Sequence, residues 1–408
     1  TGEHTDWMRL HPLARDFLLS RFEALSPREQ SGLHGRASRW YAERERFHEA
    51  ALHALAAGDE ELAQSYAARS LWALSTIGKV AEAREWLDRL PAAMLTGDTE
   101  LRLVAASVLA LGERNAEAIV FAREVLAETG ATPHERATAL RIGAGSSVFA
   151  DRLGLLPELL EQWPGPADEG GAPLYALAAL NTRAMLALHE GRTAQARAFV
   201  AEQAPYGDAG GLRLAAAFGR MIVALSHLWD GHPARAEAAL QPALLHAERD
   251  GRRGMIASLY AAILARARYE RGDVSQAQAL LANRLDVIER VGFPDNLLSA
   301  YRTLAASALA EGDENAALAC LQNLEALGAR RDLPRLRVIA IADQVRVHAA
   351  HARRETVVRL LDALDALSPE FDHEDLRPLQ PEYRLACAIA RAHAALADSR
   401  LDAAELHL

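Results

Sequence analysis

Along the middle of the chain, apolar residues follow the spacing of amphipathic helices, and the whole pattern returns about every 40 residues. The four clearest copies read LHEGRTAQARAF, LWDGHPARAEAAL, YERGDVSQAQALL and LAEGDENAALACL. Their turn glycines lie 40, 41 and 40 residues apart: Gly191, Gly231, Gly272 and Gly312. A constant period of this length predicts a repeat protein in which each repeat is a pair of helices joined at the glycine.

Small residues flank each of these glycines at fixed distances. Seven residues before the glycine stands an alanine in every copy: Ala184, Ala224, Ala265 and Ala305. Five residues after it stands another: Ala196, Ala236, Ala277 and Ala317. Antiparallel helices approach closely near their turn only where the side chains are small. We therefore predict an all-α fold, a tetratricopeptide-like superhelical solenoid of helical hairpins with a concave groove.

Composition agrees with this fold and narrows the function. Half of the residues are hydrophobic and only 6% are aromatic, which suits helices better than sheets. The chain has no apolar run that would span a membrane, no secretion signal, and two unpaired cysteines in apolar surroundings, Cys320 and Cys387. Its net charge of −10 argues against a nucleic-acid surface. We therefore expect a cytoplasmic protein that binds neither nucleic acid nor membrane.

Motifs that carry catalysis are missing. The sequence has no G-x-S-x-G elbow, no H-E-x-x-H helix and no C-x-x-C pair. The acidic stretch SPEFDHEDLRP and the pair His348 and His351 are the nearest approaches to a metal site. A solvated loop and a solvated helix face explain them more simply. We therefore predict that the chain is not an enzyme and holds no metal.

The better candidates for binding residues lie on the first helix of each hairpin, which lines the concave wall of such solenoids. Ten to twelve residues before the turn glycine, polar residues replace apolar ones: Asn181, Arg220, Tyr260, Tyr301 and Arg302. Arg183 occupies an offset that is apolar in the other copies, and His227 and Arg268 share the offset four residues before the glycine. Arginine grips anions with a planar fork, and tyrosine offers a flat face with a polar tip. We predict that these eight residues form the ligand-binding surface; the alternative is that each is a solvated or ion-paired helix residue.

Residues 8–90 resemble a known family. LHPLARDFLLSRF, followed by LHGRASRWYAERERFHEAALHALAAGDEELAQSYA, is similar to the junction after the ATPase module of MalT-like regulators, the large ATP-binding transcription regulators of the LuxR class. The matching positions are His11, Phe17, Leu18, His34, Ala37, Trp40, Tyr41, Glu49, Ala50, His53, Ala54, Gly58, Asp59 and Ala63. The resemblance implies three parts: residues 1–25 end a winged-helix, ATPase-linked region, 26–90 form the first hairpins, and 91–408 form the tetratricopeptide-like repeat sensor domain.

The resemblance also implies a function. In the family, the helical region binds a small inducer and controls ATP-dependent self-association and DNA binding of the full-length protein. The ATP would bind only in the ATPase module, because the single lysine of this chain, Lys79, lies in ALSTIGKVAE, where Ala73 and Val80 break the phosphate-loop pattern. The helix-turn-helix of the LuxR class is also missing. We therefore expect a ligand-sensing domain of a bacterial transcription activator; the alternative is a protein-protein interaction scaffold that binds a peptide or a partner protein.

Overall fold

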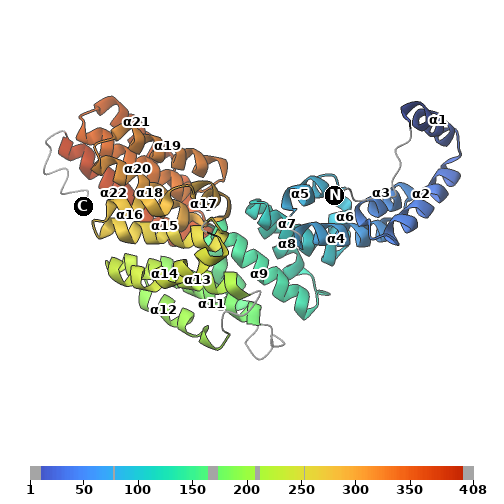
Figure 1. The fold of residues 1–408 in the computed structure, drawn as a ribbon, viewed down its shortest axis with the longest axis horizontal. Coiled ribbons are helices and arrows are strands. Elements are labelled where there is room, and N and C mark those ends of the chain that lie inside the picture. Colours follow the sequence, from blue (N-terminus) through green and yellow to red (C-terminus); the bar gives the residue numbers. More distant parts are fainter. Residues whose placement is uncertain (1–10, 77–78, 164–172, 207–211, 252, 398–408) are drawn as a thin grey trace. The chain divides into compact units, whose positions relative to one another are not determined.

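The computed structural model describes residues 11–76, 79–163, 173–206, 212–251 and 253–397, and within these ranges helices and turns occur but no strand (Figure 1). The predicted all-α solenoid of helical hairpins is confirmed. Contacts group the chain into two units, Thr1–Gly112 and Glu113–Leu408, so the predicted boundary at residue 90 falls inside the first unit. No helix in the described ranges is long and apolar enough to cross a membrane.

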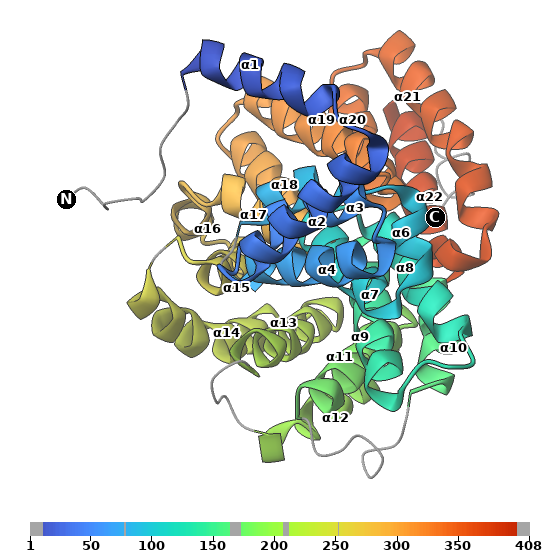
Figure 2. The same cartoon turned by 90° about the vertical axis from the view of Figure 1, so that its right-hand side faces the viewer.

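In the first unit, α2, α3 and α4 pack in succession, as Figure 2 shows, and α4 also packs on α5 and α7. Its helices are α1 (Pro12–Glu23), α2 (Pro27–Ala42), α3 (Phe47–Ala57), α4 (Glu60–Thr76), α5 (Val80–Leu87), α6 (Ala92–Gly97) and α7 (Thr99–Leu111). Local sequence fixes where they begin. His11 caps α1 by accepting a hydrogen bond from Leu13 N, and Ser26 and Glu29 form a reciprocal capping box at α2.

Aromatic rings hold the first hairpin, α2 and α3, together. His53 stacks on Tyr41 with 5.3 Å between ring centroids, and its Nδ1 lies 2.8 Å from Nδ1 of His34. Trp40 leaves 42% of its surface exposed, packs edge-on against Tyr41 and carries the Arg44 guanidinium 4.0 Å above its ring. Four of the residues that resemble the MalT-like junction therefore have structural roles in this hairpin, namely His34, Trp40, Tyr41 and His53.

The second unit is a longer series of hairpins. Its α-helices are α8 (Asn115–Ala127), α9 (Pro133–Phe149), α10 (Leu156–Glu161), α11 (Pro173–His189), α12 (Thr193–Ala201), α13 (Arg213–Trp229), α14 (Pro233–Ala247), α15 (Met255–Glu270), α16 (Val274–Leu281), α17 (Leu285–Val291), α18 (Pro294–Ala310), α19 (Glu314–Arg330), α20 (Pro334–Ala350), α21 (Arg354–Ala366) and α22 (Gln380–Ala397). Short 3-10 helices lie between them, among them η1 (Leu153–Leu155), η5 (Ser368–Asp372) and η6 (Glu374–Leu379).

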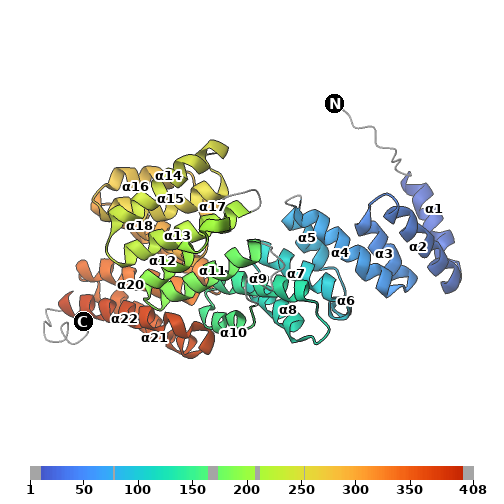
Figure 3. The same ribbon diagram turned by 90° about the horizontal axis from the view of Figure 1, so that it is seen from below.

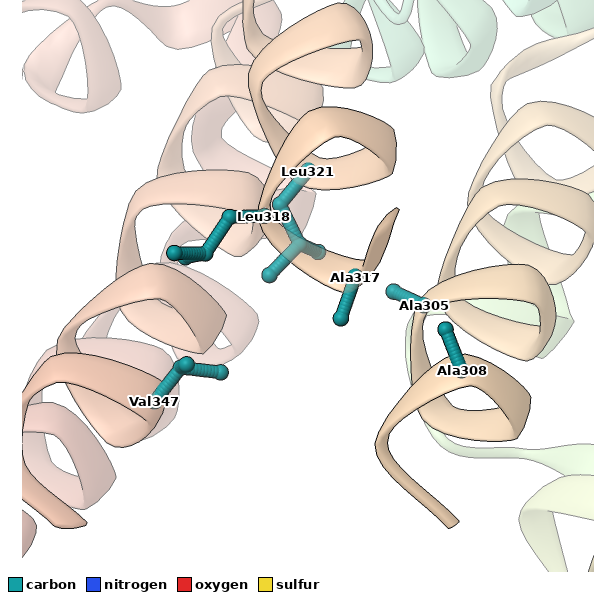
Figure 4. Packing of buried hydrophobic residues seen from close by; sticks show 6 residues of the cluster. All are labelled: Ala305, Ala308, Ala317, Leu318, Leu321 and Val347. Atoms are coloured by element: carbon teal, nitrogen blue, oxygen red, sulfur yellow. The ribbon is translucent and has the colours of Figure 1, made fainter. Parts of the chain in front are cut away.

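The turn glycines and flanking alanines behave as the repeat predicts. Gly191, Gly231, Gly272 and Gly312 all adopt the left-handed backbone, with φ between 73° and 85°. All eight flanking alanines are at most 3% exposed. Figure 4 shows one such crossing, where Ala305 and Ala308 of α18 face Ala317 of α19. Leu318 and Leu321 of α19 fill the space toward Val347 of α20, so each hairpin buries its apolar stripe against the next.

Three further turns continue the same period without glycine. Asp151 lies 40 residues before Gly191, Ala352 lies 40 residues after Gly312, and Glu113 opens the unit; all three have a positive φ, of 60°, 50° and 67°. A left-handed conformation costs a residue with a side chain about 1–2 kcal/mol. The hairpin geometry therefore imposes this turn even where the sequence does not favour it.

Three phenylalanine rings from different repeats pack together inside the second unit. Phe149 of α9, Phe218 of α13 and Phe293 before α18 meet with ring centroids 5.9–6.4 Å apart. Beside them, the fully buried Asn296 donates a hydrogen bond to Leu259 O at 3.0 Å and contacts the Met221 sulfur. Side chains from different repeats therefore pack together inside the second unit.

The second unit closes on itself at a seam between η1 and η6. Figure 3 shows the helices that directly follow them in the sequence, α10 and α22. A Cβ added to Gly154 would lie 1.9 Å from Glu374 O, so only glycine permits this backbone approach. Arg152 bridges the seam with ion pairs to Asp332 at 2.6 Å and Asp375 at 3.3 Å. One superhelical turn thus brings residues near 152 against residues near 375.

A cluster of buried charged residues lies next to this seam, around Arg335. Arg335 of α20 is 2% exposed and forms paired contacts of 2.8–3.0 Å with Asp151 and Asp295, and a contact of 3.3 Å with Glu382. Burial alone would raise the pKa of Asp295, but Arg335 and His189 hold it well below its ordinary value. Burial alone would lower the pKa of Arg335, but the carboxylates raise it. Burial raises the pKa of Asp151, although Arg335 opposes this shift. Asp295 and Arg335 are therefore held in their charged forms, and the cluster joins four parts of the unit.

Candidate functional site

Two of the eight predicted binding residues face each other. Arg220 of α13 and Tyr260 of α15 are 40 residues apart, and Nη1 of the arginine lies 3.5 Å from the tyrosine hydroxyl. Because successive hairpins stack with a constant rotation, equivalent positions in neighbouring repeats become neighbours in space. The repeat register thus brings these two side chains together.

Arg220 and Tyr260 line a cleft of about 750 Å³ that opens to solvent between α13, α14 and α15. Its other lining residues are Arg213, Leu214, Ala239, Pro242, Ala243, His246, Ala247, Gly254, Met255, Ile256 and Ala257. Pro242 lies inside α14, where it removes one helical hydrogen bond and disfavours regular packing. Small side chains on the same face of α14 keep the space open. We call this space the α13–α15 cleft.

Charge in the α13–α15 cleft is of one sign. Arg213 and Arg220 supply two guanidinium groups and His246 an imidazole, whereas none of the described lining residues carries a carboxylate. Met255, which is 41% exposed, and Leu214 supply apolar surface beside them. Guanidinium groups bind carboxylate or phosphate with paired hydrogen bonds. The cleft therefore favours an anionic group attached to an apolar body, and its lining includes neither a serine nor a cysteine nucleophile.

Asn181 and Tyr301 each join elements of the fold. Nδ2 of Asn181 donates to Ala215 O at 2.7 Å, and its Oδ1 accepts from Nε2 of Gln203 at 2.7 Å. The Tyr301 hydroxyl donates to Oε1 of Glu289 at 2.5 Å. Burial and this hydrogen bond raise the pKa of Tyr301 well above its ordinary value. Both side chains have polar partners inside the protein.

Arg268 and Arg302 form ion pairs between repeats. Arg302 of α18 binds Asp343 of α20 at 2.7 Å, and Arg268 of α15 binds Glu237 of α14 at 2.8 Å. The alternative of ion-paired helix residues thus describes their surroundings. A ligand would have to displace these carboxylates to reach either guanidinium.

Arg183 and His227 lie apart from the α13–α15 cleft. Arg183 is partly buried and forms no hydrogen bond or ion pair within the described ranges. Burial lowers the pKa of His227, with Arg197 acting in the same direction, and its Nδ1 has no hydrogen-bond partner among the described residues. Of the eight residues, the structure thus brings only Arg220 and Tyr260 together in this cleft, and ligand binding by all eight stays a prediction.

The wall of the α13–α15 cleft that α14 and the start of α13 form was not predicted from the sequence. His246 and Pro242 belong to α14, the outer helix of its hairpin, and Arg213 opens α13. All eight predicted residues lie on the first helix of a hairpin, so the prediction does not include the second helix. A proline inside a helical pattern was the available signal, since it marks a place where close packing fails.

The two weak metal candidates have other partners. Glu370 pairs with Arg337 at 3.3 Å, and its stretch forms the 3-10 helices η5 and η6. His351 contacts Glu314 at 3.2 Å, and His348 contacts Arg353. Among the described residues, no group of three or more histidine, cysteine, aspartate or glutamate side chains is placed to hold a metal ion.

No family model matches the chain. It is similar to the serine/threonine-protein kinase PknK of Mycobacterium tuberculosis and of Mycobacterium bovis, with 28% identity over 368 residues. The match covers 86% of this chain and 32% of the kinase, so the chain spans about a third of the relatives' length. The kinase motifs H-R-D and D-F-G do not occur in its 408 residues. The similarity therefore does not include a kinase catalytic loop.

Two solved helical-repeat structures align along most of the chain. A Rap protein complexed with competence and sporulation factor is 11% identical, with a TM-score of 0.38, covering 92% of this chain and 99% of that one. The human IFIT1 dimer with PPP-AAAA is 14% identical, with a TM-score of 0.45, covering 97% and 92%. Scores of this size do not extend the likeness to any site.

Proposed function

We propose that this chain is a non-catalytic protein-interaction module that holds an acidic segment of a partner protein in the α13–α15 cleft. The observation that carries the proposal is the juxtaposition of Arg220 and Tyr260 in a cleft whose described lining has cations but no carboxylate. The cleft is open to solvent rather than enclosed, which suits a segment of a partner protein. Carboxylates of the segment would bind the guanidinium groups, and its apolar side chains would cover Met255 and Leu214.

A second candidate is favoured by the size of the cleft. Its volume of about 750 Å³ lies within the range of small-molecule sites. In that case a small anionic inducer binds there, and the chain is the sensor region of a MalT-like transcription regulator, as the resemblance of residues 8–90 implies. The inducer would act by preferring one curvature of the superhelix, because only differential affinity shifts a conformational equilibrium.

Fluorescence anisotropy with a labelled peptide of alternating glutamate and leucine tests the first candidate. Arg220→Ala should weaken binding about tenfold or more, since a charge-assisted hydrogen bond contributes about 1.5–3 kcal/mol. Tyr260→Phe should weaken it less. Arg359→Ala removes the same charge from the exposed face of α21 and serves as the control.

The same variants separate the two candidates. A thermal-shift screen of small organic acids, with Arg220→Ala as the reference, should be silent if the occupant is a peptide. A ligand at a hundred times its dissociation constant adds about 2.7 kcal/mol, which is easily seen. A shift that Arg220→Ala abolishes supports the inducer, whereas equal behaviour of Arg220→Ala and Arg359→Ala in both assays excludes both candidates at this cleft.

A further inference from the structure

A second cleft, larger than the α13–α15 cleft, lies at the seam where the second unit closes on itself, and we call it the seam cleft. Its volume is about 1150 Å³. One wall comes from η1 and α10, the opposite wall from η6 and the start of α22, and the ends of α11 and α13 lie between them. The seam cleft therefore exists only when residues near 155 and residues near 378 are held together.

The walls are fixed by the contacts that close the unit. The backbone of Gly154 abuts that of Glu374, and both residues line the cleft. Glu382, on the same surface, binds the buried Arg335 at 3.3 Å. His189 lies 3.4 Å from Asp295, and its ring meets Trp229 edge-on at 5.1 Å. A site with walls held by such contacts is preorganised, which lowers the entropic cost of binding.

The seam cleft has excess negative charge. Five glutamates line it against two arginines, namely Glu158, Glu161, Glu190, Glu374 and Glu382 against Arg123 and Arg377. Three of the glutamates have cationic partners, which are Arg123, Arg192 and Arg335. Glu161 and Glu374 are exposed and form no ion pair within the ranges that the structure describes. These two carboxylates are available to an incoming cation.

Apolar surface accompanies the carboxylates. Leu385 is 60% exposed at the cleft, and Trp229 presents part of its ring beside His189. Three prolines, Pro157, Pro378 and Pro381, add rigid apolar surface. The side chain of His189 is only 2% exposed, and its Nε2 lies 3.4 Å from Oδ2 of Asp295. The cleft thus combines acidic and apolar surface.

We propose that the seam cleft binds a basic segment of a partner protein. Arginine or lysine side chains of the segment bind Glu161 and Glu374, and an apolar residue between them packs on Leu385 and Trp229. The volume exceeds the usual range of about 300–1,000 Å³ for small-molecule sites, which favours a peptide over a small amine. A metal ion is not the occupant, because the described residues include no metal-binding group here. This site is separate from the α13–α15 cleft and opposite to it in charge.

Binding is measured with a labelled synthetic peptide in which arginine and leucine alternate, by fluorescence anisotropy at low salt. The double variant Glu161→Gln with Glu374→Gln should weaken binding about tenfold, because it removes two charge-assisted contacts that each contribute about threefold. Glu202→Gln with Glu355→Gln removes the same charge from exposed positions elsewhere in the unit and should leave binding unchanged. Arg377→Gln should strengthen it.

Two further peptides complete the test. Replacing the leucines by serine should weaken binding, and replacing the arginines by glutamate should abolish it. The proposal is overturned if the control double variant weakens binding as much as the seam variant, because the effect would then be one of net charge. It is also overturned if the serine peptide binds as well as the leucine peptide, or if no binding occurs. Arg220→Ala should not affect this peptide, so failure here is distinguishable from failure of the proposed function.

Discussion

The two units are built from the same kind of helix pair but differ in which residues hold them together. In the first unit, polar contacts between elements join near neighbours in the sequence: Gln64 donates to Met94 O at 3.1 Å, and Arg84 to Gly112 O at 3.2 Å. In the second unit, Arg335 binds Asp151, 184 positions away. The first unit therefore approximates a one-dimensional array, whereas the second depends on contacts between its distant ends.

The ion pairs of the two units also differ, because those of the second unit include deeply buried ones. Ion pairs of the first unit, such as Lys79 with Glu82, are half exposed and contribute about 0–1 kcal/mol each. In the second unit, Arg335 and Asp151 are at most 2% exposed. Loss of one partner from a buried pair leaves an uncompensated charge, so the second unit is far more sensitive to substitution at its charged residues.

Replacing Arg335 should have the largest effect. Arg335→Ala leaves Asp151 and Asp295 buried without their cation and should lower the free energy of unfolding by about 3–5 kcal/mol. Hydrogen exchange measured by mass spectrometry should show protection lost in α9, α18, α20 and α22, but not in α2 to α4. Arg253→Ala, which removes an exposed pair with Asp286, should cost less than about 1 kcal/mol. Equal stabilities of the two variants would show that the buried cluster does not hold the unit.

Gly154→Ala should have an intermediate effect. Its Cβ would overlap Glu374 O, so the seam backbone must move apart, at a cost of about 1–3 kcal/mol. Gly145→Ala is the matched control, because Gly145 lies within α9 with nothing within 4 Å of its added Cβ. That variant should gain up to about 1 kcal/mol from helix propensity. Thermal unfolding compares the two, and a neutral Gly154→Ala would mean that η1 and η6 are not in close contact.

The substitutions of Arg335 and Gly154 act on contacts between residues far apart in the sequence, which a local sequence pattern does not predict. Glycine and alanine at fixed offsets predicted the hairpins, because packing between adjacent helices depends on residues close in sequence. Closure of the unit depends on Asp151 and Arg335, whose separation of 184 residues is unrelated to the repeat period. The left-handed turn at Asp151 also lacks the glycine that identified the other copies.

For the candidate binding residues, too, the local pattern does not predict which positions meet in the fold. Arg220, Tyr260 and Tyr301 occupy similar offsets from their glycines, yet only the first two line a shared cleft. Tyr301 instead binds Glu289 of α17, a helix that the other repeats do not have in that form. An offset identifies the face of a helix, but it does not show whether another part of the chain already covers that face.

Lowering the pH should have the smallest effect of these changes, and it should destabilise the first hairpin, α2 and α3. Nδ1 of His34 and Nδ1 of His53 lie 2.8 Å apart, so one must donate and the other accept, and the pair cannot persist with both rings protonated. Burial, and then His34, hold the pKa of His53 below its ordinary value of 6.5. The folded form therefore binds this proton less readily than the unfolded form. The stabilisation is full above 6.5 and is lost as the pH falls toward the lower, folded pKa.

Hydrogen exchange of α2 and α3, corrected for intrinsic rates, should therefore show less protection at about pH 5.5 than at about pH 7.5. His53→Gln, which retains a polar side chain without the titrating ring, should reduce this dependence on pH. His348→Gln serves as the control, because its ring belongs to the second unit and should not affect α2 and α3. If His53→Gln keeps the full dependence, another group destabilises the first hairpin in acid, and His34 and His53 then act only through packing.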